Sequence, residues 1–190
     1  MLDATRRRME KLLTRGLIPT RAAEQAYEAL FLNAFTAFEA FVEELFVGLM
    51  VAGGPGSVIM GGIARRATVR SPRIARELAM GGRSYADWLP FDLTEKRAHI
   101  FFRGGLPFTA LGAASKDILR KGGLVRNAIA HKSRYSLSMF EQHVIGATPL
   151  PPRERTPAGF LRGTLIAAPP QTRFESFTSG ILVAARALAK

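Results

Sequence analysis

Three polar residues near the middle of the chain have types and spacing that suit the cleavage of a phosphodiester bond. They are Arg126, Asn127 and His131, in the segment LVRNAIAHKS. A histidine, whose ordinary pKa is about 6.5, can take a proton from a ribose 2′-hydroxyl near neutral pH. An arginine is always charged and can hold the phosphate while negative charge builds on its oxygens. This scheme needs no metal ion.

The spacing of these residues predicts that they share one side of a helix. At 3.6 residues per turn the apolar residues of the segment form one face, and the three polar residues lie on the other. Asn127 precedes His131 by four residues, so we expect its amide to orient the imidazole. The spacing alone carries little weight, because arginine is abundant enough here to match a histidine by chance. Two further features strengthen the prediction of a catalytic site: the helix has one apolar and one polar face, and an asparagine directly follows the arginine.

Composition favours a globular protein with a polyanionic partner. The 190 residues are about one domain in length, with 47% hydrophobic and 22% charged residues. The net charge is +12, and most of the 27 basic residues are arginine, which places RNA or another nucleic acid first among partners. A genome rich in G and C would give the same excess, so charge alone does not decide. The lack of cysteine excludes a disulfide scaffold, a cysteine-ligated zinc site and a thiol nucleophile.

No segment predicts a membrane anchor. The most apolar stretch, residues 29–52, is interrupted by Glu39, Glu43 and Glu44, which disfavours a membrane span. The N-terminal residues are charged and lack the apolar core of a signal peptide. We therefore expect a cytoplasmic protein without a membrane partner.

The hydrophobic pattern predicts an all-α fold, a helical bundle that forms a single domain over residues 1–190. The clearest element is a long amphipathic helix over residues 21–50 with an aromatic-rich buried stripe. A glycine pair, Gly122-Gly123, predicts a break between a helix at 109–121 and the helix that carries the motif. Residues 146–172 hold six of the 11 prolines and predict an irregular arm or loop. We expect further helices at 2–15, 73–80, 94–102 and 174–189.

Several other residues are candidates for a supporting role. Four basic residues are predicted to contact the RNA backbone, with solvated surface charge as the alternative: Lys132, Arg134, Arg65 and Arg66. The last two lie within a glycine-rich loop at 53–72, which lacks the Gly-Lys-Ser/Thr of a phosphate-binding loop. Glu39 borders the buried stripe of the long helix and is a candidate carboxylate behind the catalytic residues.

The remaining polar and aromatic candidates favour structural roles. Glu95 and His99 share a helix face and provide half of a metal site, but no third ligand is evident and an ion pair is the favoured interpretation. We therefore predict neither a metal nor another cofactor. Trp88 and Phe91 have the chemistry to stack on a base, yet their apolar, proline-bounded setting predicts that they belong to the core.

The motif segment resembles the signature of the HEPN family, in which an arginine, usually followed by a polar residue, precedes a histidine by a few residues. The resemblance extends to the runs YEALFLNAFTAFEAFVEELF, DWLPFDLTEKRA, FFRGGLPF and TPAGFLRG, which are similar to the RiboL-PSP-HEPN branch. It covers most of residues 21–190 and is more specific than the short motif.

The resemblance implies a homodimer in which two motif helices form one composite active site. It also implies a metal-independent endoribonuclease of the toxin or antiphage-defence type, with an antitoxin protein as a further partner. Arg126 would then stabilise the phosphate, His131 would act as general acid and base, and Asn127 would orient the pair. The alternatives are a non-catalytic HEPN module that dimerises and binds RNA or a nucleotide, and a basic DNA-binding protein. The last is disfavoured because no helix-turn-helix spacing is evident.

Overall fold

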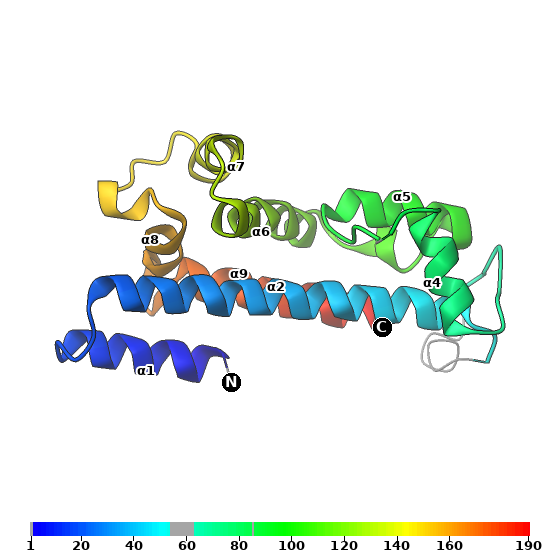
Figure 1. The fold of residues 1–190 in the computed structure, drawn as a ribbon, viewed down its shortest axis with the longest axis horizontal. Coiled ribbons are helices and arrows are strands. Elements are labelled where there is room, and N and C mark those ends of the chain that lie inside the picture. The colour runs from blue at the N-terminus through cyan, green and yellow to red at the C-terminus, as the bar shows by residue number, and fades with distance from the viewer. Residues whose placement is uncertain (1, 54–62, 85) are drawn as a thin grey trace. The chain divides into compact units, whose positions relative to one another are not determined.

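The chain folds predominantly into helices, which confirms the predicted all-α class (Figure 1). The computed structural model describes residues 2–53, 63–84 and 86–190. Among the helices that it describes, none has the length and apolarity needed to cross a membrane. The α-helices are α1 (Leu2–Thr14), α2 (Thr20–Met50), α4 (Pro72–Met80), α5 (Phe91–Phe101), α6 (Ala113–His131), α7 (Arg134–Phe140), α8 (Pro157–Arg162) and α9 (Arg173–Leu188).

The chain divides into two compact units. The first comprises Met1–Thr36 and Lys121–Ile181, and the second comprises Ala37–Arg120 and Leu182–Lys190. The long helices α2, α6 and α9 each contribute residues to both units. The C-terminal part of α6, which carries Arg126 and His131, lies in the first unit, and Trp88 lies in the second. A single domain over residues 1–190 stays a prediction.

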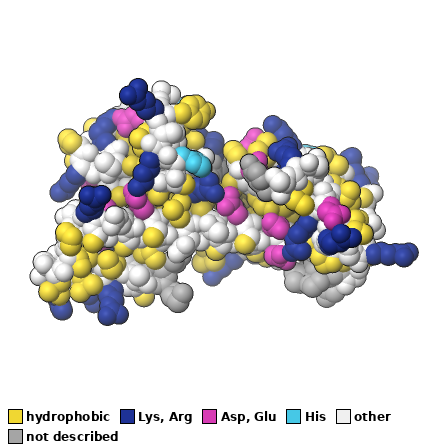
Figure 2. Space-filling view, viewed as in Figure 1, with side chains coloured by type: hydrophobic (Ala, Val, Ile, Leu, Met, Phe, Trp, Pro, Cys, Tyr) yellow, Lys and Arg dark blue, Asp and Glu magenta, His cyan; other side chains and the backbone are white. Residues whose placement is uncertain are grey.

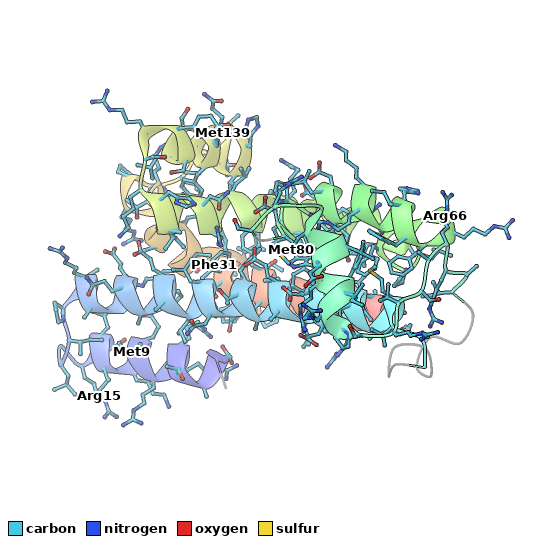
Figure 3. The ribbon with its side chains drawn as sticks, turned by 45° about the vertical axis from the view of Figure 1, so that its right-hand side comes forward. Met9, Arg15, Phe31, Arg66, Met80 and Met139 are labelled. Carbon is cyan, nitrogen blue, oxygen red and sulfur yellow. The ribbon has the colours of Figure 1, made fainter. Side chains whose placement is uncertain are left out.

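The core of the first unit is a cluster of aromatic rings from α2 and α9. Phe31 of α2, labelled in Figure 3, lies 5.7 Å from the Phe177 ring in an edge-to-face arrangement. Tyr27 meets Phe174 in the same way at 5.4 Å, and Phe160 of α8 joins the cluster at 6.4 Å from Phe177. Edge-to-face pairs at these distances add to the stabilisation from burial. The aromatic stripe predicted for the long helix is therefore core.

The predicted break at Gly122-Gly123 is wrong, because α6 runs through both glycines without interruption. A Cβ atom at Gly122 would overlap Cζ of Phe35 and lie 2.9 Å from its Cε2, with Phe177 Cδ1 at 3.3 Å on another side. A Cβ at Gly123 would meet nothing within 4 Å. Gly122 thus allows α6 to pack closely on two phenylalanine rings, and the pair does not end the helix.

The second unit is organised around Phe46 of α2. Its ring lies 5.0–5.2 Å from the rings of Trp88, Phe102 and Phe108. The Trp88 indole donates a hydrogen bond to Glu43 at 3.1 Å. Trp88 and Phe91 are each only 5% exposed. This confirms their assignment to the core and removes them as base-stacking candidates.

The proline-rich segment at 146–172 is more regular than its composition predicts. It contains the 3₁₀ helix η4 (Pro152–Glu154), helix α8 and a two-stranded antiparallel sheet of β1 (Thr164–Ala167) and β2 (Pro170–Thr172). Several prolines occupy the starts of elements, where a missing N–H costs nothing. Pro157 begins α8, for example, and the hydroxyl of Thr156 caps that helix by accepting from the Gly159 N–H.

Candidate active site

The last three turns of α6 present the predicted two faces. Val125, Ala128 and Ile129 are buried, at 4% exposure or less. Arg126 and Asn127 are half-buried, and His131 is exposed at the helix end. The apolar face therefore holds the helix against the first unit, while the polar face carries the guanidinium, the amide and the imidazole.

The amide of Asn127 holds the arginine rather than the histidine. Arg126 Nη1 donates to Asn127 Oδ1 at 3.0 Å. Within the described residues, the His131 side chain makes no hydrogen bond or ion pair. The predicted contact between Asn127 and His131 is thus not formed, and the arginine is the group that the asparagine positions. The imidazole keeps both nitrogens available to exchange protons with a bound molecule.

A sharp turn ends α6 directly after His131. Lys132 adopts a positive φ of 48°, and Ser133 begins α7 through a capping box with Ser136. The Ser133 hydroxyl accepts from the Ser136 N–H, and the Ser136 hydroxyl accepts from the Ser133 N–H, both at 3.1 Å. Because both donors are satisfied reciprocally, the turn is well defined. It leaves His131 at the surface and not within a longer helix.

The two basic residues beside the motif differ in how they are engaged. Lys132 pairs with Glu28 of α2 at 3.3 Å, so part of its charge is already compensated. Arg134 is exposed at the start of α7 and forms no ion pair with another described residue. Of the predicted phosphate contacts next to the motif, Arg134 is therefore the better placed to bind an external anion. Figure 2 shows other Lys and Arg side chains spread over the visible face with acidic side chains between them.

The other predicted site residues belong to the second unit. Arg65 is half-buried, and the backbone around it is bonded to that at the end of α5, where the Arg66 N–H donates to Phe101 O at 2.8 Å. Arg66 is exposed, and Glu39 is half-buried on α2. The motif belongs to the first unit, and the roles of these three residues stay predictions. Residues 54–62 of the glycine-rich loop lie outside the described residues.

The proposed half of a metal site is engaged in an ion pair instead. Glu95 contacts Lys116 at 2.6 Å. In the described ranges, no group of three or more His, Asp or Glu side chains is placed to hold a metal ion. The favoured interpretation, an ion pair, is correct for Glu95, although its partner is Lys116 and not His99.

The first unit has two grooves that the motif residues do not line. One is lined by residues of α8 and the start of α2, among them Thr20, Glu24 and Arg162. The other lies between α1, the small sheet and α9. Neither is lined by Arg126 or His131. Of the two, His131 is exposed at the end of α6 and Arg126 is half-buried.

Sequence reasoning missed a buried polar network that fixes α1. Arg6 is 8% exposed and forms ion pairs with Asp3 and with Glu175 of α9. Its guanidinium also donates to the hydroxyl of Tyr27 at 3.4 Å. Burial raises the pKa of Tyr27 to about 12. Tyr27 and Glu175 are far from Arg6 in the sequence, so no local pattern reveals these two contacts.

A second ion pair joins α1 to α8. Arg162 donates to Glu10 at 3.0 and 3.3 Å. Burial opposes the charge of Glu10, but hydrogen bonds from Arg162 and Tyr27 outweigh it and lower the pKa of that carboxyl. The first unit thus holds its N-terminal helix by paired charges as well as by apolar packing.

Comparison with known proteins found no matching family model, no matching curated protein and no matching solved structure. The resemblance to the HEPN family therefore stays a prediction based on the motif and the four runs. The candidate site rests on the geometry of α6 and its neighbours.

Proposed function

We propose that this protein is a metal-independent endoribonuclease of the HEPN type, acting in the cytoplasm on RNA. One observation carries the proposal: a half-buried guanidinium, held by an amide, shares the solvent-facing side of α6 with an exposed imidazole. This is the combination that phosphodiester cleavage by a neighbouring hydroxyl requires, namely a fixed positive charge and a group that exchanges protons near neutral pH.

Arg126 binds a non-bridging oxygen of the scissile phosphate in this proposal. Asn127 helps to hold the guanidinium through its 3.0 Å hydrogen bond, which lowers the entropy lost when the phosphate binds. The positive charge then stabilises the negative charge that develops on the equatorial oxygens during the displacement. Arg134 supplies a second contact to the RNA backbone.

His131 transfers the protons. Acting as a base, it removes the proton of the 2′-hydroxyl, and the 2′-oxygen attacks the adjacent phosphorus. The bond from phosphorus to the 5′-oxygen breaks, and a protonated imidazole donates its proton to that oxygen. The products are a 2′,3′-cyclic phosphate and a 5′-hydroxyl. The reaction consumes no water and needs no oxidant or metal.

A second copy of the chain supplies the opposite wall of the site. A single copy leaves His131 exposed to solvent, whereas the reaction needs both a base and an acid around an enclosed phosphate. Two motif helices related by a twofold axis would provide two imidazoles, one for each proton transfer. An antitoxin protein that covers this surface would then silence the enzyme.

Cleavage of purified tRNA and total RNA in the presence of EDTA tests the proposal. The wild-type protein is expected to cut, and His131→Ala is expected to lose about 10²- to 10⁴-fold in rate, the usual contribution of a general acid or base. His143→Ala is the matched control, because His143 is also exposed but lies outside the motif. Equal cutting by wild type and His131→Ala would refute the assignment, and RNA binding without cutting by any variant would favour the non-catalytic module.

Mixing two inactive variants tests the composite site. Arg126→Ala and His131→Ala chains, unfolded and refolded together, are expected to regain part of the activity, since a mixed dimer keeps one arginine and one histidine in the shared site. If each chain used only its own pair, the mixture would stay inactive.

A further inference from the structure

The second unit has a groove between α4 and α5 that the proposed ribonuclease site does not use. The two helices lie side by side (Figures 1 and 3), and the groove between them holds about 440 Å³, within the size range of ligand sites. Figure 3 labels Met80, which lines the groove at the end of α4. The lining includes Leu78, Met80, Leu93, Lys96, Arg97 and Ile100.

The apolar stripe of α4 is wider than the part that the unit buries. Ala75 and Ala79 are buried, at 0% and 4% exposure. Ile74 and Leu78 lie beside them on the helix surface, yet remain 39% and 46% exposed. Arg76 fixes the opposite side of α4 through ion pairs with Glu43 and Glu44 of α2. Packing and ion pairs therefore hold α4 with aliphatic side chains facing outward.

Helix α5 continues this apolar surface. Leu93, Arg97 and Ile100 share one face of the helix, at intervals of four and three residues. Ile100 is 64% exposed. A partner that covered Ile100 would remove this apolar surface from water, which favours association.

Positive charge surrounds the apolar lining. Lys96 and Arg83 are well exposed and only loosely paired, each 3.7 Å from its nearest carboxylate. The Arg97 guanidinium lies 4.7 Å above the Trp88 ring and donates to the Asp87 carbonyl. Burial and the nearby charge of Arg83 lower the pKa of Arg97, so an added carboxylate would relieve this repulsion.

We propose that this groove docks an acidic amphipathic segment of another protein, whose apolar side chains cover Leu78 and Ile100 and whose carboxylates pair with Lys96 and Arg83. A protein segment fits better than RNA, because the exposed lining is aliphatic and the tryptophan is buried beneath Arg97. Unstacked bases bind mainly to exposed aromatic rings. The proposal rests on the second unit alone and is independent of the ribonuclease activity.

Selection from a displayed library of random 16-residue peptides tests the proposal with the full-length protein. Wild-type protein is expected to enrich sequences that combine Asp or Glu with Leu, Ile or Phe at intervals of three and four. The double variant Leu78→Glu, Ile100→Glu should lose this enrichment. Both side chains are exposed, so the variant should keep its helical circular dichroism. Failure of the wild type to enrich any such sequence would overturn the proposal.

Titration of one enriched peptide then separates the apolar and ionic contributions. Ile100→Ser should weaken binding about ten-fold or more. Lys96→Gln should weaken it several-fold at 50 mM salt, with a smaller effect at 500 mM. Arg73→Gln, which removes a charge from α4 outside the groove lining, is the matched control and should change binding less than two-fold.

Two results would assign the groove to another occupant and overturn the proposal. One is displacement of the peptide by a single-stranded RNA whose own binding Lys96→Gln weakens and Ile100→Ser does not. The other is a fall in oligomeric mass, measured by light scattering, when Ile100 is replaced by glutamate, because it would identify a second copy of this chain in the groove.

Discussion

The two adjacent glycines of α6 should respond in opposite ways to alanine. Alanine removes the conformational freedom of glycine in the unfolded chain and favours a helix interior by about 1 kcal/mol. Gly123 faces open space, so Gly123→Ala should stabilise the protein by about that amount. Gly122 faces Phe35, and its substitution must also displace a buried ring.

The cost at Gly122 follows from the packing around it. The new Cβ would overlap Cζ of Phe35, and Phe177 at 3.3 Å blocks the other side. Phe35 is itself fully buried, 4.9 Å from the Phe31 ring. Overpacking of this kind costs about 1–3 kcal/mol. Because both substitutions gain the same helix propensity, their difference in unfolding free energy should equal this packing cost.

Chemical denaturation monitored by circular dichroism measures the difference. Gly122→Ala should be less stable than Gly123→Ala by about 1–3 kcal/mol, and their midpoints of thermal unfolding should differ by about 2–4 °C per kcal/mol for a chain of this size. Adding Phe35→Leu to Gly122→Ala should recover part of the loss, a coupling absent with Gly123→Ala. Equal destabilisation by both alanines would mean that α6 is interrupted at this pair and would refute the close packing.

Three further predictions concern the network around α1. Glu175→Ala should destabilise the protein by about 3 kcal/mol in denaturant titrations, because it leaves the buried Arg6 charge without its partner on α9; no loss would show the pair to be unimportant. The raised pKa of Tyr27, about 12, favours the protonated phenol in the folded state. Stability on the order of 2–3 kcal/mol is therefore present below pH 10 and lost as the pH rises towards 12, a slope that Tyr27→Phe should remove. The lowered pKa of Glu10 gives the opposite dependence: its contribution is present above about pH 4.5 and lost as the pH falls, so Glu10→Gln should flatten the acid limb of the stability curve. An unchanged acid limb would exclude the ion pair with Arg162.

The hydrophobic period predicted the elements that bury a continuous stripe. The long helix, the motif helix and the C-terminal helix all show apolar residues three and four apart, and all three form. The same period predicted which side of the motif helix is buried. In these helices the local sequence and the tertiary packing favour the same structure, so a single sequence is enough to predict them.

The features that sequence reasoning missed depend on partners distant in the chain. Gly122 lies inside a helix, where Phe35 and Phe177 leave no room for a larger side chain. Neither phenylalanine is near Gly122 in the sequence, so the local pattern does not predict this contact. Arg6 is buried because Glu175, 169 residues away, compensates its charge. The number of prolines in 146–172 predicts an irregular segment, but several of these prolines stand at the first residue of a helix or strand.

Within the candidate site, residue types were predictable and their hydrogen bonds were not. Helical spacing correctly placed Arg126, Asn127 and His131 on one polar side. The Asn127 amide could reach either neighbour, and only the side-chain conformation of Arg126 decides that it binds the guanidinium. The turn at Lys132 and the capping box of Ser133 then expose His131.

The central claim is tested most directly by the chemical ends of RNA that the purified protein cuts in EDTA. Attack by the 2′-hydroxyl predicts a 2′,3′-cyclic phosphate on one fragment and a 5′-hydroxyl on the other, both absent with His131→Ala and present with His143→Ala. Fragments that carry a 3′-hydroxyl and a 5′-phosphate, or cutting that needs added Mg²⁺, would contradict the assignment of Arg126 and His131 as a metal-independent catalytic pair.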